Sequence, residues 1–260
     1  MESGGASVPV SRTDTPASDS PKRTKIAVYC GASAGFDSAH VEAARALARA
    51  MAANNIGLVY GGGTVGLMGE VAKTLVSLSG PESVHGIIPE ALVRYERDPH
   101  YTSTSTSAAA TPSGTTTTTT PKENAPKEEP LAVPEEKIFG RTTVVADMHT
   151  RKRMMAQEVI EGGPGSGFVA LSGGYGTLEE LFETMTWNQL GIHSRGICVL
   201  NINGFYDGIL SWINKSVEEG FIHGENKKIL VEARTAEDAI EALRNYTVSK
   251  AVFKLSWNSQ

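Results

Sequence analysis

Short apolar runs that alternate with longer amphipathic stretches are the feature that most constrains what this chain can fold into. The runs have the length of strands, and the stretches between them carry apolar residues at helical spacing. Parallel strands need a helix-length crossover between them, so the alternation favours a parallel sheet covered by helices. We therefore predict an α/β fold: a Rossmann-like, doubly wound parallel sheet in a three-layer α/β/α sandwich, formed by a single domain. The runs predicted to form strands are Lys25–Cys30, Gly57–Tyr60, Ser83–Ile88, Arg141–Ala146, Gly167–Leu171, Ile197–Asn201 and Lys228–Val231.

Three segments lack this periodicity. Residues 1–24 are rich in Ser, Thr, Pro, Asp and Gly, which predicts a disordered tail. Residues 98–137 combine a threonine run with prolines and mixed Lys/Glu, and they predict a disordered surface insertion because the alternation resumes on its far side. The folded domain is therefore predicted to span residues 25–245, and residues 246–260 are predicted to form a C-terminal tail.

Composition and charge argue against several classes of function. The chain is 40% hydrophobic and 20% charged with a net charge of −5, which argues against a nucleic-acid polymer as partner. The N-terminus has no hydrophobic signal core, and no apolar run approaches the ~20 residues that span a bilayer. We therefore predict a cytoplasmic protein with no membrane partner. Cys30 and Cys198 each lie inside an apolar run, which predicts two buried thiols and no disulfide.

The glycine-rich stretch Ser172–Glu180 predicts a phosphate site. It follows an apolar strand and leads directly into an amphipathic helix. Its glycines leave backbone N–H groups uncovered, and the helix N-terminus adds unpaired donors and a partial positive charge. The pattern places Glu179 and Glu180 in the first helical turn, at the rim of the same pocket. The helix macrodipole alone favours an acid there, but two acids directly after this turn favour a functional role.

A second glycine turn, Gly61–Gly66, follows the second predicted strand. Its glycine spacing formally matches the dinucleotide fingerprint, which would indicate a dehydrogenase. The match is weak because the turn does not follow the first strand, and because Ile87 and Ile88 stand where an acid would bind a ribose. A phosphate-binding role that is shared with the turn at Ser172–Glu180 accounts for both turns.

Arg151 and Lys152 are predicted in the first turn of a helix after the fourth strand. Cations are unfavourable at a helix N-terminus unless an anion is nearby, so a phosphate partner explains their position, although most such pairs are solvated surface charges. Since ligands of such sheets bind at the carboxyl ends of the strands, these cations and both glycine turns are expected to face one crevice. The six histidines show no metal-ligand spacing, so we predict no metal.

At these residues the sequence resembles the Lonely Guy family of cytokinin riboside 5′-monophosphate phosphoribohydrolases, often mislabelled as lysine decarboxylases. The resemblance covers nearly everything from Lys25 to about Leu243 except the insertion. It implies hydrolysis of the N-glycosidic bond of N6-modified adenosine 5′-monophosphates, and possibly AMP, to free base and ribose 5-phosphate. The motifs that carry it are Cys30–Ser33, Tyr60–Gly63, Gly66–Gly69, Ile88–Pro89, Met148–Lys152, Gly173–Glu180 and Thr186–His193.

The resemblance also implies roles for single residues. Arg151 and Glu180 match the catalytic pair of the family. A nucleoside 5′-monophosphate is the implied substrate, no cofactor is implied, and family members are typically homodimers. The residues that match substrate-binding positions are Ser33, Gly62, Gly63, Glu96, Arg151, Lys152, Gly173, Gly174, Tyr175, Gly176, Thr177, Leu178, Glu179 and Thr186.

Two departures from the family pattern bear on the site. Ser172 stands where the family usually has proline, and Thr150 replaces the usual acid between His149 and Arg151. A non-catalytic nucleotide-binding or sensing module of the same fold is the alternative function, and the presence of Glu180 argues against it. A lysine decarboxylase would need a lysine for pyridoxal phosphate, and no lysine other than Lys152 is suitably placed.

Overall fold

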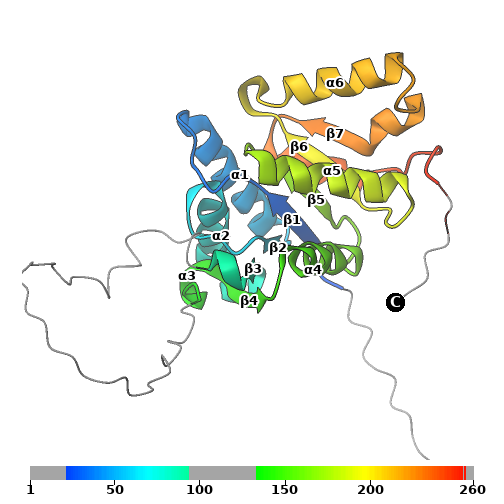
Figure 1. Ribbon diagram of the computed structural model, residues 1–260. Helices are drawn as coiled ribbons and strands as arrows, with labels where there is room; N and C mark the ends of the chain where they lie inside the picture. Colours follow the sequence, from blue (N-terminus) through cyan, green and yellow to red (C-terminus); the bar gives the residue numbers. More distant parts are fainter. Residues whose placement is uncertain (1–21, 94–132, 254, 256–260) are drawn as a thin grey trace, which may run out of the picture.

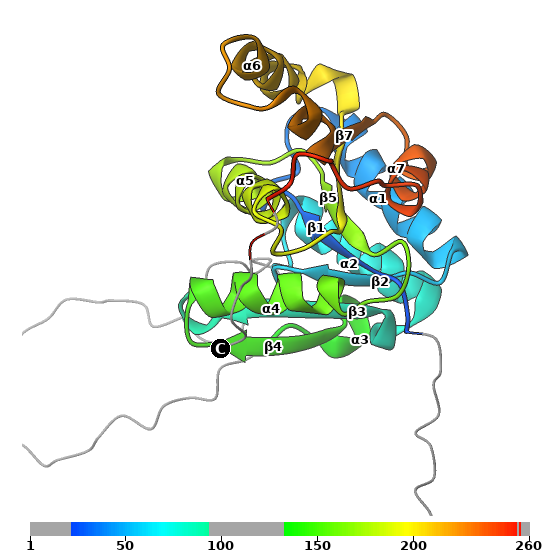
Figure 2. The same ribbon diagram turned by 90° about the vertical axis from the view of Figure 1, so that its right-hand side faces the viewer.

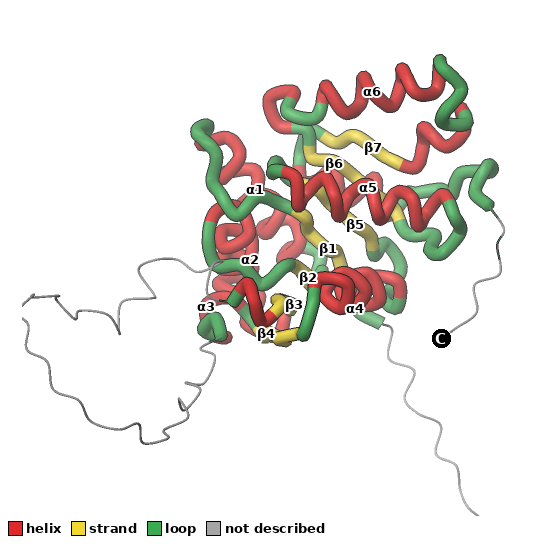
Figure 3. Tube along the Cα trace, in the orientation of Figure 1, coloured by secondary structure: helices red, strands yellow, loops and turns green. Residues whose placement is uncertain are grey.

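The computed structural model describes residues 22–93, 133–253 and 255. Within these residues the chain forms one parallel sheet of seven strands in the order β4-β3-β2-β1-β5-β6-β7 (Figures 1 and 3). The predicted parallel α/β architecture is therefore confirmed. The strands are β1 (Lys25–Tyr29), β2 (Gly57–Tyr60), β3 (Val84–Pro89), β4 (Arg141–Val145), β5 (Gly167–Ala170), β6 (Gly196–Leu200) and β7 (Leu230–Ala233).

Helices cover both faces of the sheet (Figure 2). The first face carries α1 (Ser38–Ala53), α2 (Gly66–Ser79), the short α3 (Glu136–Phe139) and α7 (Ala236–Arg244). The second face carries α4 (Met148–Ile160), α5 (Tyr175–Gln189) and α6 (Asp207–Glu218). Short 3₁₀ turns at Pro81–Ser83, Glu90–Leu92, Ile202–Gly204 and Gly224–Ile229 complete the described elements.

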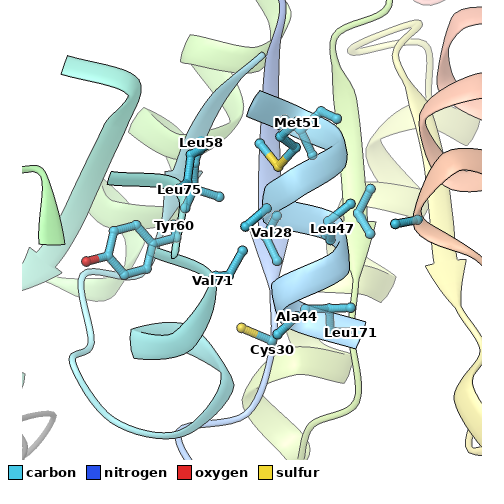
Figure 4. Packing of buried hydrophobic residues seen from close by; sticks show 14 of the residues in the cluster. Val28, Cys30, Ala44, Leu47, Met51, Leu58, Tyr60, Val71, Leu75 and Leu171 are labelled. Atoms are coloured by element: carbon cyan, nitrogen blue, oxygen red, sulfur yellow. The ribbon is translucent and has the colours of Figure 1, made fainter. Parts of the chain in front are cut away.

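The core consists of two apolar clusters, one on each face of the sheet. Successive residues of a strand point to opposite faces, so Val28 packs under α1 and α2 while Ala27 and Tyr29 pack under α4 and α5. Figure 4 shows the first cluster, in which Leu47 and Met51 of α1 lie over β1. Strands that are buried on both faces read as continuous apolar runs, which is why the sequence located them.

The order in which successive strands are added to the sheet reverses at β1, although all strands stay parallel. The chain proceeds from β1 through β2 and β3 to β4 on one side, then returns to pair β5 with the free side of β1. Such a reversal opens a crevice between the loops that leave the two strands at their carboxyl ends. In this chain those loops begin at Cys30 and Leu171.

Several boundaries differ from the sequence prediction. Thr24 was assigned to the tail, but its carbonyl accepts a hydrogen bond from the N–H of Gly57 at 2.9 Å. Thr24 thus satisfies the backbone donor of the first residue of β2. Helix α3 begins inside the predicted insertion, and the N–H of Phe253, assigned to the C-terminal tail, donates to Gln189 O at 2.9 Å. The last strand begins at Leu230, after a 3₁₀ turn, and not at Lys228. Residues 98–132 of the proposed insertion lie outside the described residues.

Cys30 and Cys198 are both buried, as predicted, and no disulfide joins them. None of the helices in the described ranges combines the length and the apolar character that a membrane crossing requires. The same residues contain no group of three or more His, Cys, Asp or Glu side chains that could hold a metal ion.

Burial of His193 predicts a pH dependence of stability. Its Nε2–H donates to Thr184 O at 3.0 Å, and its Nδ1 accepts the N–H of Arg195 at 3.1 Å, so the neutral ring is fully satisfied. Burial lowers the pKa of His193 to about 4, below the ordinary value of 6.5. Because the unfolded chain binds this proton more readily, stability from His193 is present above pH ~6.5 and is lost as the pH falls toward ~4, by about 3 kcal/mol.

Urea unfolding of wild type and His193→Gln at pH 7 and pH 4.5 would measure this contribution. We expect the variant to lose less stability than wild type over this interval. The exposed His223 provides the control, because His223→Gln should leave the pH dependence as in wild type. Equal pH slopes for wild type and His193→Gln would contradict the assignment.

Candidate active site

The crevice at the switch point is bounded by the loops that follow β1 and β5, which are joined by backbone hydrogen bonds. Gly31 N donates to Ser172 O at 3.0 Å, and Leu171 N donates to Tyr29 O at 2.9 Å. A Cβ on Gly173 would come within 2.9 Å of Gly31 N, so the two loops can approach this closely only with glycine there. The side chain of Ser172 is buried, and its hydroxyl lies 2.9 Å from Nδ1 of His40 on α1.

The glycine turn leads into α5 earlier than predicted. The helix begins at Tyr175 with Gly174 as its N-cap, so Glu179 and Glu180 lie in the second turn and not in the first. The prediction was wrong because Gly176 resembled part of the turn, although a helix tolerates glycine at its start. No side chain caps this N-terminus, so its first N–H groups face the crevice without an intrahelical partner. A Cβ placed on Gly174 or Gly176 would meet no atom within 4 Å.

Arg151 and Glu180 form a buried ion pair at the floor of this region. Nη2 of Arg151 lies 3.2 Å from Oε1 of Glu180, and the side chains are only 8% and 9% exposed. The pair joins α4 to α5 across the ends of the central strands. Nε of Arg151 is buried without a hydrogen-bond partner within the described ranges, so the guanidinium retains capacity for a further acceptor.

Gly61, directly after β2, leaves the space that Arg151 occupies. A Cβ at this position would lie 2.3 Å from Nη2 and 3.0 Å from Cζ of Arg151. The second glycine turn thus contributes to the site because Gly61 leaves room for the side chain of Arg151. Gly62 and Gly63, predicted to bind substrate, follow it in the same buried turn, and Gly62 has a positive φ of 78°.

A buried hydrogen-bond chain supports the backbone beside Glu180. The hydroxyl of Thr184 donates to Glu180 O at 2.7 Å, so the hydroxyl of Tyr29 must donate to Thr184 Oγ1, 3.0 Å away. Burial, together with the negative charge of Glu180, raises the pKa of Tyr29 far above its usual range. Tyr29 is therefore a neutral donor that fixes the position of α5 over β1.

Lys152 bridges two carboxylates on α5. Its Nζ lies 2.6 Å from Oε1 of Glu179 and 3.1 Å from Oε1 of Glu183. Burial alone would lower the pKa of Lys152, but these two hydrogen-bonded carboxylates raise it, so the residue is a cation. Asp147 caps the helix that carries both cations, since its Oδ1 accepts the N–H of Thr150 at 2.8 Å.

A mainly apolar pocket of about 670 Å³ adjoins the glycine turn on the side of α1 and α6. Phe36, Leu67 and Phe205 supply apolar walls, and His40 and the predicted substrate-binding residue Ser33 supply polar groups. The pocket also contacts Gly173 and Gly174, so a ligand bound at the turn can extend into it.

Most predicted site residues therefore lie around one crevice. Thr177 is buried next to Gly173, Leu178 is partly buried beside the second-face core, and Tyr175 is 95% exposed at the mouth. Thr186 does not join them, because it lies nine residues beyond Thr177, roughly 13 Å along the helix, and donates to Phe182 O. Glu96 lies outside the described residues.

Sequence reasoning missed several residues of the site: Tyr29, Asp147, Glu183 and Thr184, and the pocket residues Phe36, His40 and Phe205. Asp147 could have been found, because an aspartate three residues before Thr150 at a strand end is a helix N-cap signal. The other contacts join segments far apart in the chain and leave no local pattern.

The strand order and the crevice define an α/β protein that is suited to hold an anionic ligand at the switch point of a parallel sheet. Solved structures of similar fold include the molybdenum cofactor binding protein of Rippkaea orientalis and the molybdenum cofactor carrier protein of Chlamydomonas reinhardtii. Each has a TM-score of 0.52 and 15% identity, over 86% of this chain and 98% of the other. At this identity the likeness concerns the fold alone.

Sequence comparison gives the family. A family model described as "Possible lysine decarboxylase" matches residues 68–243. A cytokinin riboside 5′-monophosphate phosphoribohydrolase of Arabidopsis thaliana is 36% identical over 241 residues, which cover 92% of this chain and 91% of that protein. A probable enzyme of the same name from Oryza sativa subsp. japonica is 37% identical over 238 residues, covering 91% and 79%. The chain belongs to this family of cytokinin riboside 5′-monophosphate phosphoribohydrolases, which confirms the resemblance.

A fungal relative is longer. The bifunctional cytokinin biosynthesis protein of Fusarium pseudograminearum (strain CS3096) is 51% identical over 223 residues, which cover 86% of this chain. The match spans only 40% of the fungal protein.

Proposed function

We propose that this protein hydrolyses the N-glycosidic bond of N6-modified adenosine 5′-monophosphates, and of AMP to some extent, to release the free base and ribose 5-phosphate. The observation that carries the proposal is the buried pair of Arg151 and Glu180 beside an uncapped, glycine-lined helix N-terminus. The names of the Arabidopsis and rice relatives support the same reaction.

The chemistry requires stabilisation of a positive charge on the ribose. As the bond from C1′ to the base nitrogen breaks, its electron pair leaves with the base and C1′ acquires oxocarbenium character. Glu180 would stabilise this charge and accept a proton from the water that adds to C1′, and this same proton is then passed to the departing base. Arg151 orients the Glu180 carboxylate through their 3.2 Å contact, and its unpartnered Nε can bind a substrate oxygen.

The phosphate is assigned to the N-terminus of α5, whose N–H groups are open to the crevice. The apolar pocket lined by Phe36, Leu67 and Phe205 supports a base with an apolar N6 substituent, since it adjoins the same turn. A homodimer and a cytoplasmic location belong to the proposal. A second subunit would explain why Thr186 lies remote from the crevice of its own chain.

Chromatography of products tests the reaction. Purified protein is incubated with N6-isopentenyladenosine 5′-monophosphate and, in parallel, with AMP. We expect free base and ribose 5-phosphate from both, with faster release from the N6-modified nucleotide. Release of no base from either, with nucleotide binding intact, would reject the hydrolase and favour the non-catalytic sensing module. The oligomeric state follows from light scattering of the same preparation.

Gly176→Ala tests the phosphate assignment. Its Cβ meets no atom within 4 Å, so we expect stability to be maintained while the KM for the nucleotide rises about tenfold, because the methyl group occupies the space that the phosphate approaches. Gly208→Ala is the matched control, since this glycine is also helical, on α6, and equally open. An unchanged KM in Gly176→Ala would place the phosphate elsewhere.

A further inference from the structure

A second pocket, which is polar, lies at the amino ends of the strands. The proposed active site lies at their carboxyl ends. The chain enters β1 at the edge where this second pocket lies (Figure 2). The pocket has a volume of about 190 Å³ and lies at the starts of β1 to β4, with Val84 and His85 of β3 in its lining. It is smaller than the roughly 300–1,000 Å³ typical of sites for whole drug-sized ligands, so it suits a small group.

Charge in this pocket is opposite in sign to that of the whole chain. Arg23, Lys25 and Arg141 contribute three positive charges to its lining, and Glu82 and Glu158 contribute two negative charges, whereas the chain carries −5. The negative charge of Glu158 is already balanced by Lys25, because its Oε2 lies 2.7 Å from Nζ of Lys25. Its Oε1 contacts Nδ1 of His85. Arg23 and Arg141 then remain with two positive charges, which the exposed Glu82 offsets only in part.

Among the described residues, the contacts of His85 leave Nη2 of Arg141 without a suitable acceptor. Burial opposes ionisation of Glu158, but hydrogen bonds from His85 and Lys25 lower its pKa to about 2, so the carboxylate only accepts. Nδ1 of His85 must then carry the proton that it donates to Glu158. Nη2 of Arg141, 3.2 Å from the same Nδ1, consequently faces an N–H and cannot donate to it.

The hydrogen bonds of Arg23 likewise go to neutral groups. Its Nε donates to Asn55 O at 3.2 Å and its Nη1 to Glu82 O at 3.4 Å, and both acceptors are neutral carbonyls. No carboxylate within the described part of the chain lies within 4 Å of Arg23 or Arg141. Both arginines line the same small pocket, and guanidinium groups are well suited to donate hydrogen bonds to a tetrahedral oxyanion.

We propose that this pocket binds a small tetrahedral oxyanion, either inorganic phosphate or the phosphate group of a monoester, between Arg23 and Arg141. The anion would accept hydrogen bonds from both guanidinium groups. For Arg141 it would supply the acceptor that His85 cannot provide. The site is separate from the catalytic crevice, because it lies at the other end of the strands.

Phosphate binding to the full-length chain tests the proposal. Equilibrium dialysis with radiolabelled inorganic phosphate counts the sites per chain in wild type, in the double variant Arg23→Gln/Arg141→Gln and in the control Arg234→Gln, whose exposed arginine lies outside the pocket. We expect the double variant to lose one of the phosphate sites counted in wild type, because the affinity of this pocket falls by roughly tenfold or more. We expect no change in the control. Unchanged stoichiometry and affinity in the double variant would overturn the proposal.

A measurement on the wild-type protein tests the proposal even if the double variant misfolds. The imidazole NMR signal of His85, assigned with His85→Gln, should shift on addition of millimolar phosphate or sulfate. Parallel titrations with ribose 5-phosphate and with ribose distinguish a monoester from free phosphate, because the pocket limits the size of the attached group. If the His85 signal does not shift with any of these anions, the proposal is also overturned.

Discussion

Glu180→Gln is expected to reduce kcat for nucleotide hydrolysis by about 10³-fold while leaving nucleotide binding measurable. Glutamine keeps the shape of the side chain and can still accept from Arg151, but it carries no negative charge to stabilise the developing oxocarbenium ion and cannot take a proton from water. Because the change lies in the transition state, kcat should fall far more than KM rises.

Glu183→Gln is the matched control for this prediction. Glu183 lies on the same helix and shares Lys152 with Glu179, but it does not pair with Arg151. We expect the Glu183→Gln variant to hydrolyse the nucleotide at a rate within a few-fold of wild type, since Glu179 still pairs with Lys152. The catalytic assignment fails if Glu180→Gln retains a tenth or more of the wild-type rate with the fold intact by circular dichroism.

Gly61→Ala is expected to lower kcat by about 10²-fold without unfolding the protein. Its methyl group would lie 2.3 Å from Nη2 of Arg151, so the guanidinium must move away from Glu180. The clash concerns the far end of a flexible side chain, which can move, whereas a clash with backbone would threaten the fold. The measurement is kcat together with a thermal unfolding curve.

Gly57→Ala at the other end of β2 is the control for the same substitution. Its Cβ would find its nearest neighbour, Nε of Arg23, at 3.6 Å, an ordinary contact. Activity close to wild type in Gly57→Ala, and its loss in Gly61→Ala, would separate displacement of Arg151 from a general effect of alanine in this strand. Full activity in Gly61→Ala would mean that Arg151 need not occupy this position.

The fold followed from the sequence because each central strand is buried on both faces and is therefore apolar throughout. The start of α5 did not, because Gly174 and Gly176 resemble a turn whether or not a helix has begun. The position of the glycine turn between β5 and a helix could be predicted, since its sequence pattern is local. The pairing of Arg151 with Glu180 could not, because the residues are 29 positions apart and meet only through the packing of α4 and α5 and the space left by Gly61.

The partners of Lys152 and Arg151 have a consequence for how substrate is captured. Both cations are already paired in the ligand-free protein, and with Glu179, Glu180 and Glu183 the cluster holds two positive and three negative charges. Such a cluster does not draw a phosphate in from a distance. The association rate of the nucleotide should therefore vary little with ionic strength, and its recognition should depend on the fixed direction of the N–H groups of α5.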